Sequence, residues 1–132
     1  MKQYTNEGLK QALLAERDKN YDCEDYRFNS RAVNRVFKKA LKDLCTVNNL
    51  ELISYNAGYF EGSAFIKRTD GRLVYVSVSD VRHWPNFATD ILYRTCKHDK
   101  DFSGGANRYS DWEGLGKAIL SMQSNEWEGS KW

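Results

Sequence analysis

The sequence has little of the features that mark several special classes of protein. One proline occurs in 132 residues, and no Gly/Ser-rich or low-complexity tract is present, which excludes a collagen-like or disordered chain. No apolar run approaches the roughly 20 residues that a membrane-spanning helix needs. The N-terminal stretch MKQYTN has no signal-peptide core, so we expect a cytoplasmic protein. The length predicts a single domain over residues 1–132.

A strong charge of one sign and paired cysteines are also lacking. The chain has 20 Lys and Arg against 18 Asp and Glu, too close to neutrality for composition alone to indicate a nucleic-acid partner. Cys23, Cys45 and Cys96 are odd in number and widely spaced, which predicts reduced thiols rather than disulfides. Aromatic residues, in contrast, make up 14% of the chain.

Apolar residues recur at helical spacing in three segments. The first predicted helix begins after the capping pair Thr5-Asn6 and runs over residues 7–15; the polar, aperiodic stretch over 18–28 predicts a loop. The second covers residues 30–45 and has a regular apolar stripe. The third begins at Ser110 with a Ser-x-x-Glu capping box. The face of the second helix opposite its stripe carries Arg31, Arg35, Lys38, Lys39 and Lys42.

Between the second and third helices the apolar pattern changes to a period of two. This predicts four strands, over residues 50–55, 59–67, 73–78 and 91–97. Asp70-Gly71 predicts a tight hairpin turn with positive φ at both positions. The order of elements predicts an α+β fold, an antiparallel four-stranded β-meander with two N-terminal helices and one C-terminal helix.

The densest group of ligand-binding residue types lies between Asp80 and Tyr109. Arginine guanidinium groups bind phosphate, aromatic faces stack on bases, and the Gly104-Gly105 turn can present backbone N–H groups to an anion. This composition favours a phosphate- and base-bearing small molecule as ligand; in the alternative interpretation Trp84 and Phe87 only cap the core. The cluster contains Arg82, His83, Trp84, Asn86, Phe87, Arg94, Lys97, His98, Lys100, Asn107 and Arg108.

The motifs of common enzymes and metal sites are missing. There is no Gly-x-Ser-x-Gly elbow and no phosphate-binding Gly-x-x-x-x-Gly-Lys loop. With two histidines and no recognisable acid–base pair, we predict no enzyme activity, no catalytic residue and no cofactor. Cys96, His98, Asp99 and Asp101 do not have metal-ligand spacing, so no metal site is predicted. Trp127 and Trp132 are expected to dock on the core or on a second subunit.

Three segments carry a resemblance to a known family. Val76–Arg82, Ile91–Lys97 and Asp101–Asn107 resemble the Thoeris anti-defence (Tad) family of phage sponge proteins over roughly residues 50–110. The resemblance implies a protein of the host cytoplasm that sequesters a cyclic ADP-ribose isomer or related cyclic nucleotide without cleaving it, as a homo-oligomer built from dimers. It implies that Trp84 or Phe87 stacks on the base, that Asn86 reads it, and that Arg94 and Arg108 bind phosphates. The predicted ligand-binding set is Arg82, Trp84, Asn86, Phe87, Arg94, Asn107 and Arg108.

Two other functions are compatible with the sequence. The small size and mixed charge would suit a protein inhibitor of a host nuclease, of the anti-CRISPR kind. The cationic helix face over residues 31–42 would suit a nucleic-acid-binding accessory protein. Such a face is more often simply solvated, and no helix-turn-helix or RNP-like motif is present, so nucleic acid is the less favoured partner.

Overall fold

The computed structural model describes residues 3–22, 27–28, 30–57, 62–78, 86–101 and 105–127. Its helices are α1 (Asn6–Asn20), α2 (Ser30–Val47), α3 (Trp112–Ser121) and the short 3-10 helix η1 (Ser124–Trp127). Two short strands, β1 (Tyr21–Asp22) and β2 (Arg27–Phe28), pair between α1 and α2. The main sheet contains β3 (Glu51–Ala57), β4 (Gly62–Lys67), β5 (Leu73–Val78), β6 (Ile91–Cys96) and β7 (Arg108–Ser110).

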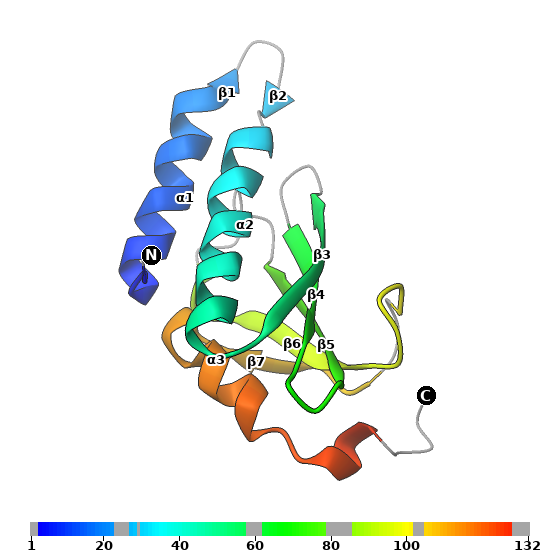
Figure 1. Ribbon diagram of the computed structural model, residues 1–132. Coiled ribbons are helices and arrows are strands. Elements are labelled where there is room, and N and C mark those ends of the chain that lie inside the picture. Colours follow the sequence, from blue (N-terminus) through cyan, green and yellow to red (C-terminus); the bar gives the residue numbers. More distant parts are fainter. Residues whose placement is uncertain are drawn as a thin grey trace.

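The main sheet is an antiparallel meander in the order β3-β4-β5-β6-β7. The predicted α+β class, with two N-terminal helices and one C-terminal helix, is confirmed (Figure 1). The prediction of four strands is wrong, because β7 adds a fifth; three residues are too few to show a period of two. The loop predicted over 18–28 is also wrong, because α1 continues to Asn20 and β1 and β2 follow.

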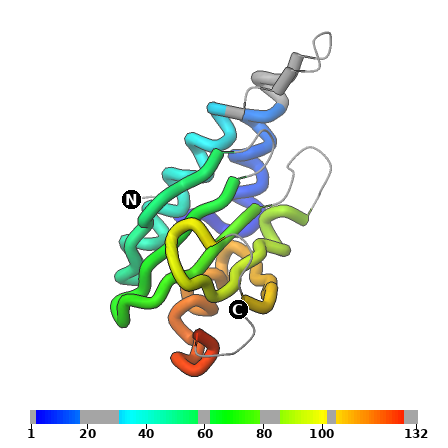
Figure 2. The backbone as a smooth tube through the Cα atoms, turned by 90° about the vertical axis from the view of Figure 1, so that its right-hand side faces the viewer, coloured from blue at the N-terminus to red at the C-terminus, as the bar shows by residue number. Residues whose placement is uncertain are grey.

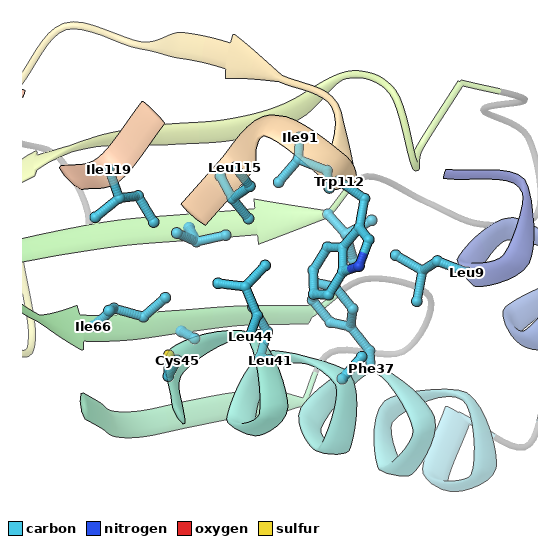
Figure 3. Close-up of a cluster of buried hydrophobic side chains, with 14 of the residues drawn as sticks. Leu9, Phe37, Leu41, Leu44, Cys45, Ile66, Ile91, Trp112, Leu115 and Ile119 are labelled. Carbon is cyan, nitrogen blue, oxygen red and sulfur yellow. The ribbon is translucent and has the colours of Figure 1, made fainter. Parts of the chain in front are cut away.

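The core lies between one face of the sheet and the three α-helices. The apolar stripe of α2 packs against inward-facing residues of β4, β5 and β6 and against α3 (Figure 3). Phe37 is central to it: its ring centroid lies 6.0 Å from those of Trp112 and Tyr55. Figure 2, turned by 90°, shows the strands in front of α1 and α2. Within the described residues, no helix combines the length and apolar character that a bilayer crossing requires.

The β4–β5 hairpin follows the sequence pattern closely. Val74, Val76 and Val78 alternate with less buried residues along β5, as predicted. The backbone N–H of Arg68 donates to the carbonyl of Arg72 at 2.8 Å, which closes the turn. Only Gly71, with φ +86°, adopts the left-handed conformation, so the expected positive φ at Asp70 is wrong: a turn closed by Arg68 and Arg72 needs only one such residue.

Helix α3 is capped by Asp111 rather than by the predicted Ser110. An Asp111 carboxylate oxygen accepts a hydrogen bond from the Gly114 N–H at 2.7 Å. Asn6, at the start of α1, selects this cap: its side-chain N–H group donates to the other Asp111 oxygen at 3.1 Å. Asn6 and Glu113 also exchange two hydrogen bonds of 2.8 Å, each from a backbone N–H to the other side chain. These bonds join the N-termini of α1 and α3.

Candidate functional site

The predicted ligand-binding set divides between several environments. Arg82 and Trp84 lie outside the described residues. Asn86 and Asn107 are exposed and Arg108 is half-exposed. Phe87 is 1% exposed and belongs to the core cluster, and Arg94 is 3% exposed. Phe87 and Arg94 are on opposite sides of the sheet, because Arg94 pairs with Tyr75, which alternates with the core valines of β5.

The segment over residues 86–90 precedes β6 and is hydrogen-bonded to the first residue of α3. The Asn86 carbonyl accepts bonds from the N–H groups of Thr89 at 3.0 Å and Asp90 at 2.8 Å, forming a turn. The Ala88 carbonyl accepts from the Trp112 N–H at 2.9 Å. Phe87 and Ala88 are buried beneath this turn. The position of Phe87 therefore agrees with the alternative interpretation, in which it caps the core.

Arg94 fixes the beginning of the connection between β6 and β7. Its guanidinium carbon lies 4.3 Å from the centroid of the Tyr75 ring. Its Nη2 donates to the Asp101 carbonyl at 3.1 Å, and the Asp101 carboxylate accepts from the Lys97 N–H at 3.0 Å. The Tyr75 ring in turn packs on Phe65 at 5.2 Å. A guanidinium buried in these contacts has a structural role.

Gly105 and Arg108 also have partners within the fold. Gly105 has φ +77°, and a Cβ atom there would lie 2.5 Å from the Thr95 carbonyl oxygen. Close packing against β6 therefore accounts for this glycine, whereas Gly104 lies outside the described residues. The Arg108 guanidinium forms an ion pair with Glu126 of η1.

A cleft lies between η1 and the β4–β5 turn. It has a volume of about 330 Å³, and three segments supply its described walls: the hairpin turn, the end of β6 and η1. The Trp127 indole N–H donates to the Leu73 carbonyl at 2.8 Å and its ring packs against the core, so the predicted docking of Trp127 is confirmed. Trp132 lies outside the described residues. The lining residues are Gly71, Arg72, Leu73, Cys96, Lys97 and Trp127.

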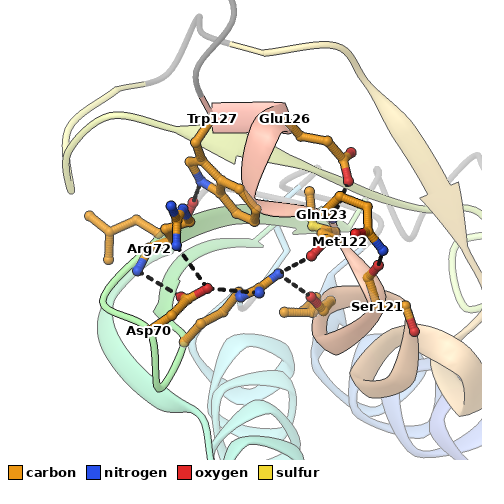
Figure 4. Close-up of polar contacts among 10 residues, drawn as sticks. Asp70, Arg72, Ser121, Met122, Gln123, Glu126 and Trp127 are labelled. Atoms are coloured by element: carbon orange, nitrogen blue, oxygen red, sulfur yellow. Dashed lines mark hydrogen bonds and ion pairs between the residues drawn. The ribbon is translucent and has the colours of Figure 1, made fainter.

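Two arginines lie against the indole ring of Trp127, and Figure 4 shows Arg72 beside it. The guanidinium carbons of Arg68 and Arg72 lie 4.8 Å and 5.8 Å from the ring centroid. Arg68 Nη1 donates to the carbonyls of Ile119 at 3.0 Å and Met122 at 2.7 Å, at the end of α3. Arg68 therefore stabilises the fold, whereas the Arg72 side chain is less buried and lines the cleft.

Asp70 balances part of this positive charge. Its Oδ2 lies 2.8 Å from Arg68 and 3.2 Å from Arg72. Burial tends to raise the pKa of Asp70, but the hydrogen bonds from the Arg72 backbone and from both guanidinium groups outweigh it and hold the pKa below its usual value. One carboxylate thus faces two guanidinium groups, and the exposed Lys97 adds a further cation to the wall.

The described lining residues of the cleft include two cations that can bind an anion and one thiol, Cys96. Burial raises the pKa of the Cys96 thiol to about 12, so this thiol stays protonated and is a poor nucleophile near neutral pH. Burial likewise raises the pKa of Cys45 to about 12, while Cys23 is outside the described residues. No histidine or carboxylate is among the described lining residues. In the part of the chain that the structure describes, no three His, Cys, Asp or Glu residues gather as a metal site would require.

Comparison of the chain with protein-family models, with curated proteins and with solved structures finds no match. The case for function therefore rests on the residues and their geometry, and the Tad resemblance stays a prediction. Sequence reasoning placed Lys97 in the ligand-binding cluster but missed Arg72 and the contribution of Trp127 to a cleft. Arg72 directly follows the Asp-Gly turn, which was a usable signal, but nothing in the sequence placed Trp127 beside it.

Proposed function

We propose that the protein is a non-catalytic binding protein that sequesters a small anionic nucleotide, such as a cyclic nucleotide or cyclic ADP-ribose immune signal. The observation that carries this proposal is the cleft in which Arg72 and Lys97 stand beside the indole of Trp127. Its volume of about 330 Å³ falls within the range of small-molecule sites in proteins. The phosphate-binding role then moves from Arg94, which is buried, and Arg108, which is not a lining residue of the cleft, to Arg72 and Lys97, which line it.

Each wall of the cleft supports one part of the recognition. The planar guanidinium of Arg72 suits two-point contact with a phosphate, and Lys97 supplies a compact charge. The indole of Trp127 offers an aromatic surface to a base. The Arg68 and Leu73 contacts hold that indole before a ligand arrives, which reduces the entropy lost on binding.

Sequestration without turnover agrees with the residues of the cleft. The described walls hold cations, a protonated thiol and apolar groups, and none of these is a general base at neutral pH. The resemblance to the Tad family extends the proposal to a phage protein of the host cytoplasm that assembles from dimers. A protein that binds an immune signal in this way deprives the host effector of its activator.

The test is ligand binding followed by recovery of the ligand. Purified protein is mixed with cyclic ADP-ribose isomers and with cyclic di- and trinucleotides, and its melting temperature is measured. Bound ligand is then released by heat and identified by mass spectrometry. We expect one ligand class to raise the melting temperature and to be recovered intact. Absence of any shift across the panel would overturn the proposal, and recovery of a cleaved ligand would indicate an enzyme instead.

Matched variants locate the site. Arg72→Ala and Lys97→Ala should each weaken binding by about 10- to 100-fold, the range expected for the loss of a charge-assisted hydrogen bond. Lys117→Ala removes an exposed lysine from α3 and should leave the affinity unchanged. If both cleft variants bind the ligand as tightly as the parent protein, this cleft is not the binding site. A stoichiometric protein partner from host lysate, without any small-molecule binding, would instead favour the nuclease-inhibitor alternative.

A further inference from the structure

The outer face of α2 presents a row of cations on the surface. Arg31, Arg35, Lys38 and Lys42 follow one another at intervals of four, three and four residues, and all are exposed. Such intervals place side chains in one line along a helix. The line is about 16 Å long at 1.5 Å per residue, and the exposed Lys39 lies beside it.

No acidic side chain of α2 interrupts this row. Asp43 is the only acidic residue of the helix, and it is buried on the side next to the core. Its carboxylate lies 2.7 Å from Lys39 Nζ, so the single acid is paired with the lysine beside the row. The exposed charged side chains that α2 itself contributes to this face are therefore all basic.

The stability of the helix does not explain the row. Like charges three or four residues apart weaken an isolated helix, and the α2 row contains three such successive pairs. The helix is held by its opposite stripe, in which Phe37, Leu41 and Leu44 are buried. A polyanion on the outer face would relieve the repulsion between the cations.

We propose that the α2 row binds the phosphate backbone of a nucleic acid, independently of base sequence. The phosphates of one strand advance by about 3.4 Å along the axis of B-form DNA, so the row matches a run of about five phosphates. Phosphate contacts by Lys and Arg give affinity without reading bases. This activity goes beyond the binding of a small nucleotide, and its residues are distinct from those of the cleft.

The same row is less suited to a membrane surface. A helix that lies on a bilayer inserts apolar side chains beside its cations, whereas the apolar stripe of α2 is buried in the core. Among the described residues, Val47 is the single large apolar side chain of α2 that is well exposed, and it follows the row at the end of the helix. Charge complementarity without apolar contact therefore favours nucleic acid over lipid.

The experiment measures fluorescence anisotropy of a labelled 20-base-pair DNA duplex, and separately of an RNA duplex, between 50 and 200 mM salt. With four phosphate contacts the slope of log K against log salt should be about −3.6, which weakens binding about 150-fold over this range. Lys38→Glu with Lys42→Glu should reduce affinity at least about 10-fold and reduce the slope by about 2. The matched control, Lys100→Glu with Lys117→Glu, makes the same charge change at exposed sites elsewhere and should stay within about 3-fold of the parent.

Each other outcome counts against the proposal. Equal losses in both double variants would show that net charge alone matters, and an unaffected Lys38/Lys42 variant would exclude the row. Absence of binding to either duplex at 50 mM salt, with binding to phosphatidylserine vesicles, would assign the row to lipid. Lys38→Gln with Lys42→Gln, which introduces no negative charge, repeats the test if the glutamate variant fails to give the far-UV circular dichroism of the parent.

Discussion

Replacement of Arg68 by alanine should destabilise the protein far more than the same change at Arg72. Both guanidinium groups contact Asp70 and the Trp127 ring, but the Arg68 side chain is 12% exposed and that of Arg72 is 32% exposed. Of the two arginines, Arg68 is the one that donates to the carbonyls of Ile119 and Met122. These carbonyls lie at the C-terminal end of α3, where the last carbonyls of a helix lack the regular intrahelical donors; the Ile119 carbonyl also accepts a longer bond of 3.4 Å from the Met122 N–H.

The magnitude follows from these contacts. Hydrogen bonds from a charged donor contribute about 1.5–3 kcal/mol each, and a partly buried cation–π contact contributes about 0.5–2 kcal/mol. Because such terms are not additive, we expect Arg68→Ala to lower the free energy of unfolding by about 3–5 kcal/mol. For Arg72→Ala we expect about 1 kcal/mol or less, the value of a surface ion pair.

Urea unfolding, followed by tryptophan fluorescence and by far-UV circular dichroism, measures both changes under the same conditions. Arg68→Lys keeps the charge, but one ammonium group must replace both Nη1, which donates to the two carbonyls, and Nη2, which donates to Asp70. Its loss should therefore lie between those of the two alanine variants. If Arg68→Ala and Arg72→Ala differ by less than about 0.5 kcal/mol, the size of an ordinary surface effect, the role given to the α3 carbonyls is wrong.

Two further predictions concern glycine and cysteine positions. Gly105→Ala should lower the free energy of unfolding by about 2–4 kcal/mol, measured by thermal or urea unfolding, because a left-handed conformation and a clash with the Thr95 carbonyl combine. Gly71 has φ +86° but no atom within 4 Å of an added Cβ, so Gly71→Ala should cost about 1–2 kcal/mol. Equal costs for the two variants would contradict the argument that Gly105 is required by close packing. Cys45 and Cys96, whose pKa values are raised to about 12, should resist thiol reagents at pH 8 until the protein unfolds. Since these thiols ionise near pH 8.5 in the unfolded chain, their contribution to stability is complete below that pH and is lost as the pH rises toward 12; a urea midpoint that stays flat between pH 7 and 10 would contradict this sign.

The fold was predictable wherever one element supplied a long periodic pattern. The 18 residues of α2 and the six of β5 each repeat their signal several times, so type and buried face were both correct. The three-residue β7 and the two-residue β1 and β2 cannot display a period. Their pairing depends on neighbouring strands, which a local pattern does not contain.

The choice of the α3 cap shows another limit of local reasoning. Ser110 and Asp111 are both good capping residues, and the sequence around them does not separate the two. The decision comes from Asn6, which lies more than 100 residues earlier and bonds to the Asp111 carboxylate. Tertiary contact thus fixes a boundary that the capping box placed one residue too early.

The candidate site was harder to predict than the fold because residue type does not reveal burial. Arg94 had the chemistry of a phosphate ligand, yet strand register places it on the Tyr75 ring and beneath the Asp101 carbonyl. Phe87 had the chemistry of a stacking residue and lies in the core. Conversely, Trp127 reaches a cleft only because η1 returns to β5, a contact between residues 54 positions apart.

That return of η1 also affects the order in which the chain can fold during synthesis. The β4–β5 hairpin closes with local contacts, but the Arg68 guanidinium can reach the carbonyls of Ile119 and Met122 only after residue 122 has emerged from the ribosome, and the Leu73 carbonyl receives the Trp127 indole only after residue 127 has emerged. Until residue 127 emerges, the Leu73 carbonyl lacks its indole donor and the Arg68 and Arg72 guanidinium groups lack their aromatic partner. The nascent domain therefore passes through a stage in which its sheet is formed but this corner is still open, and a nascent chain exposes such unfinished surface to chaperones and to self-association.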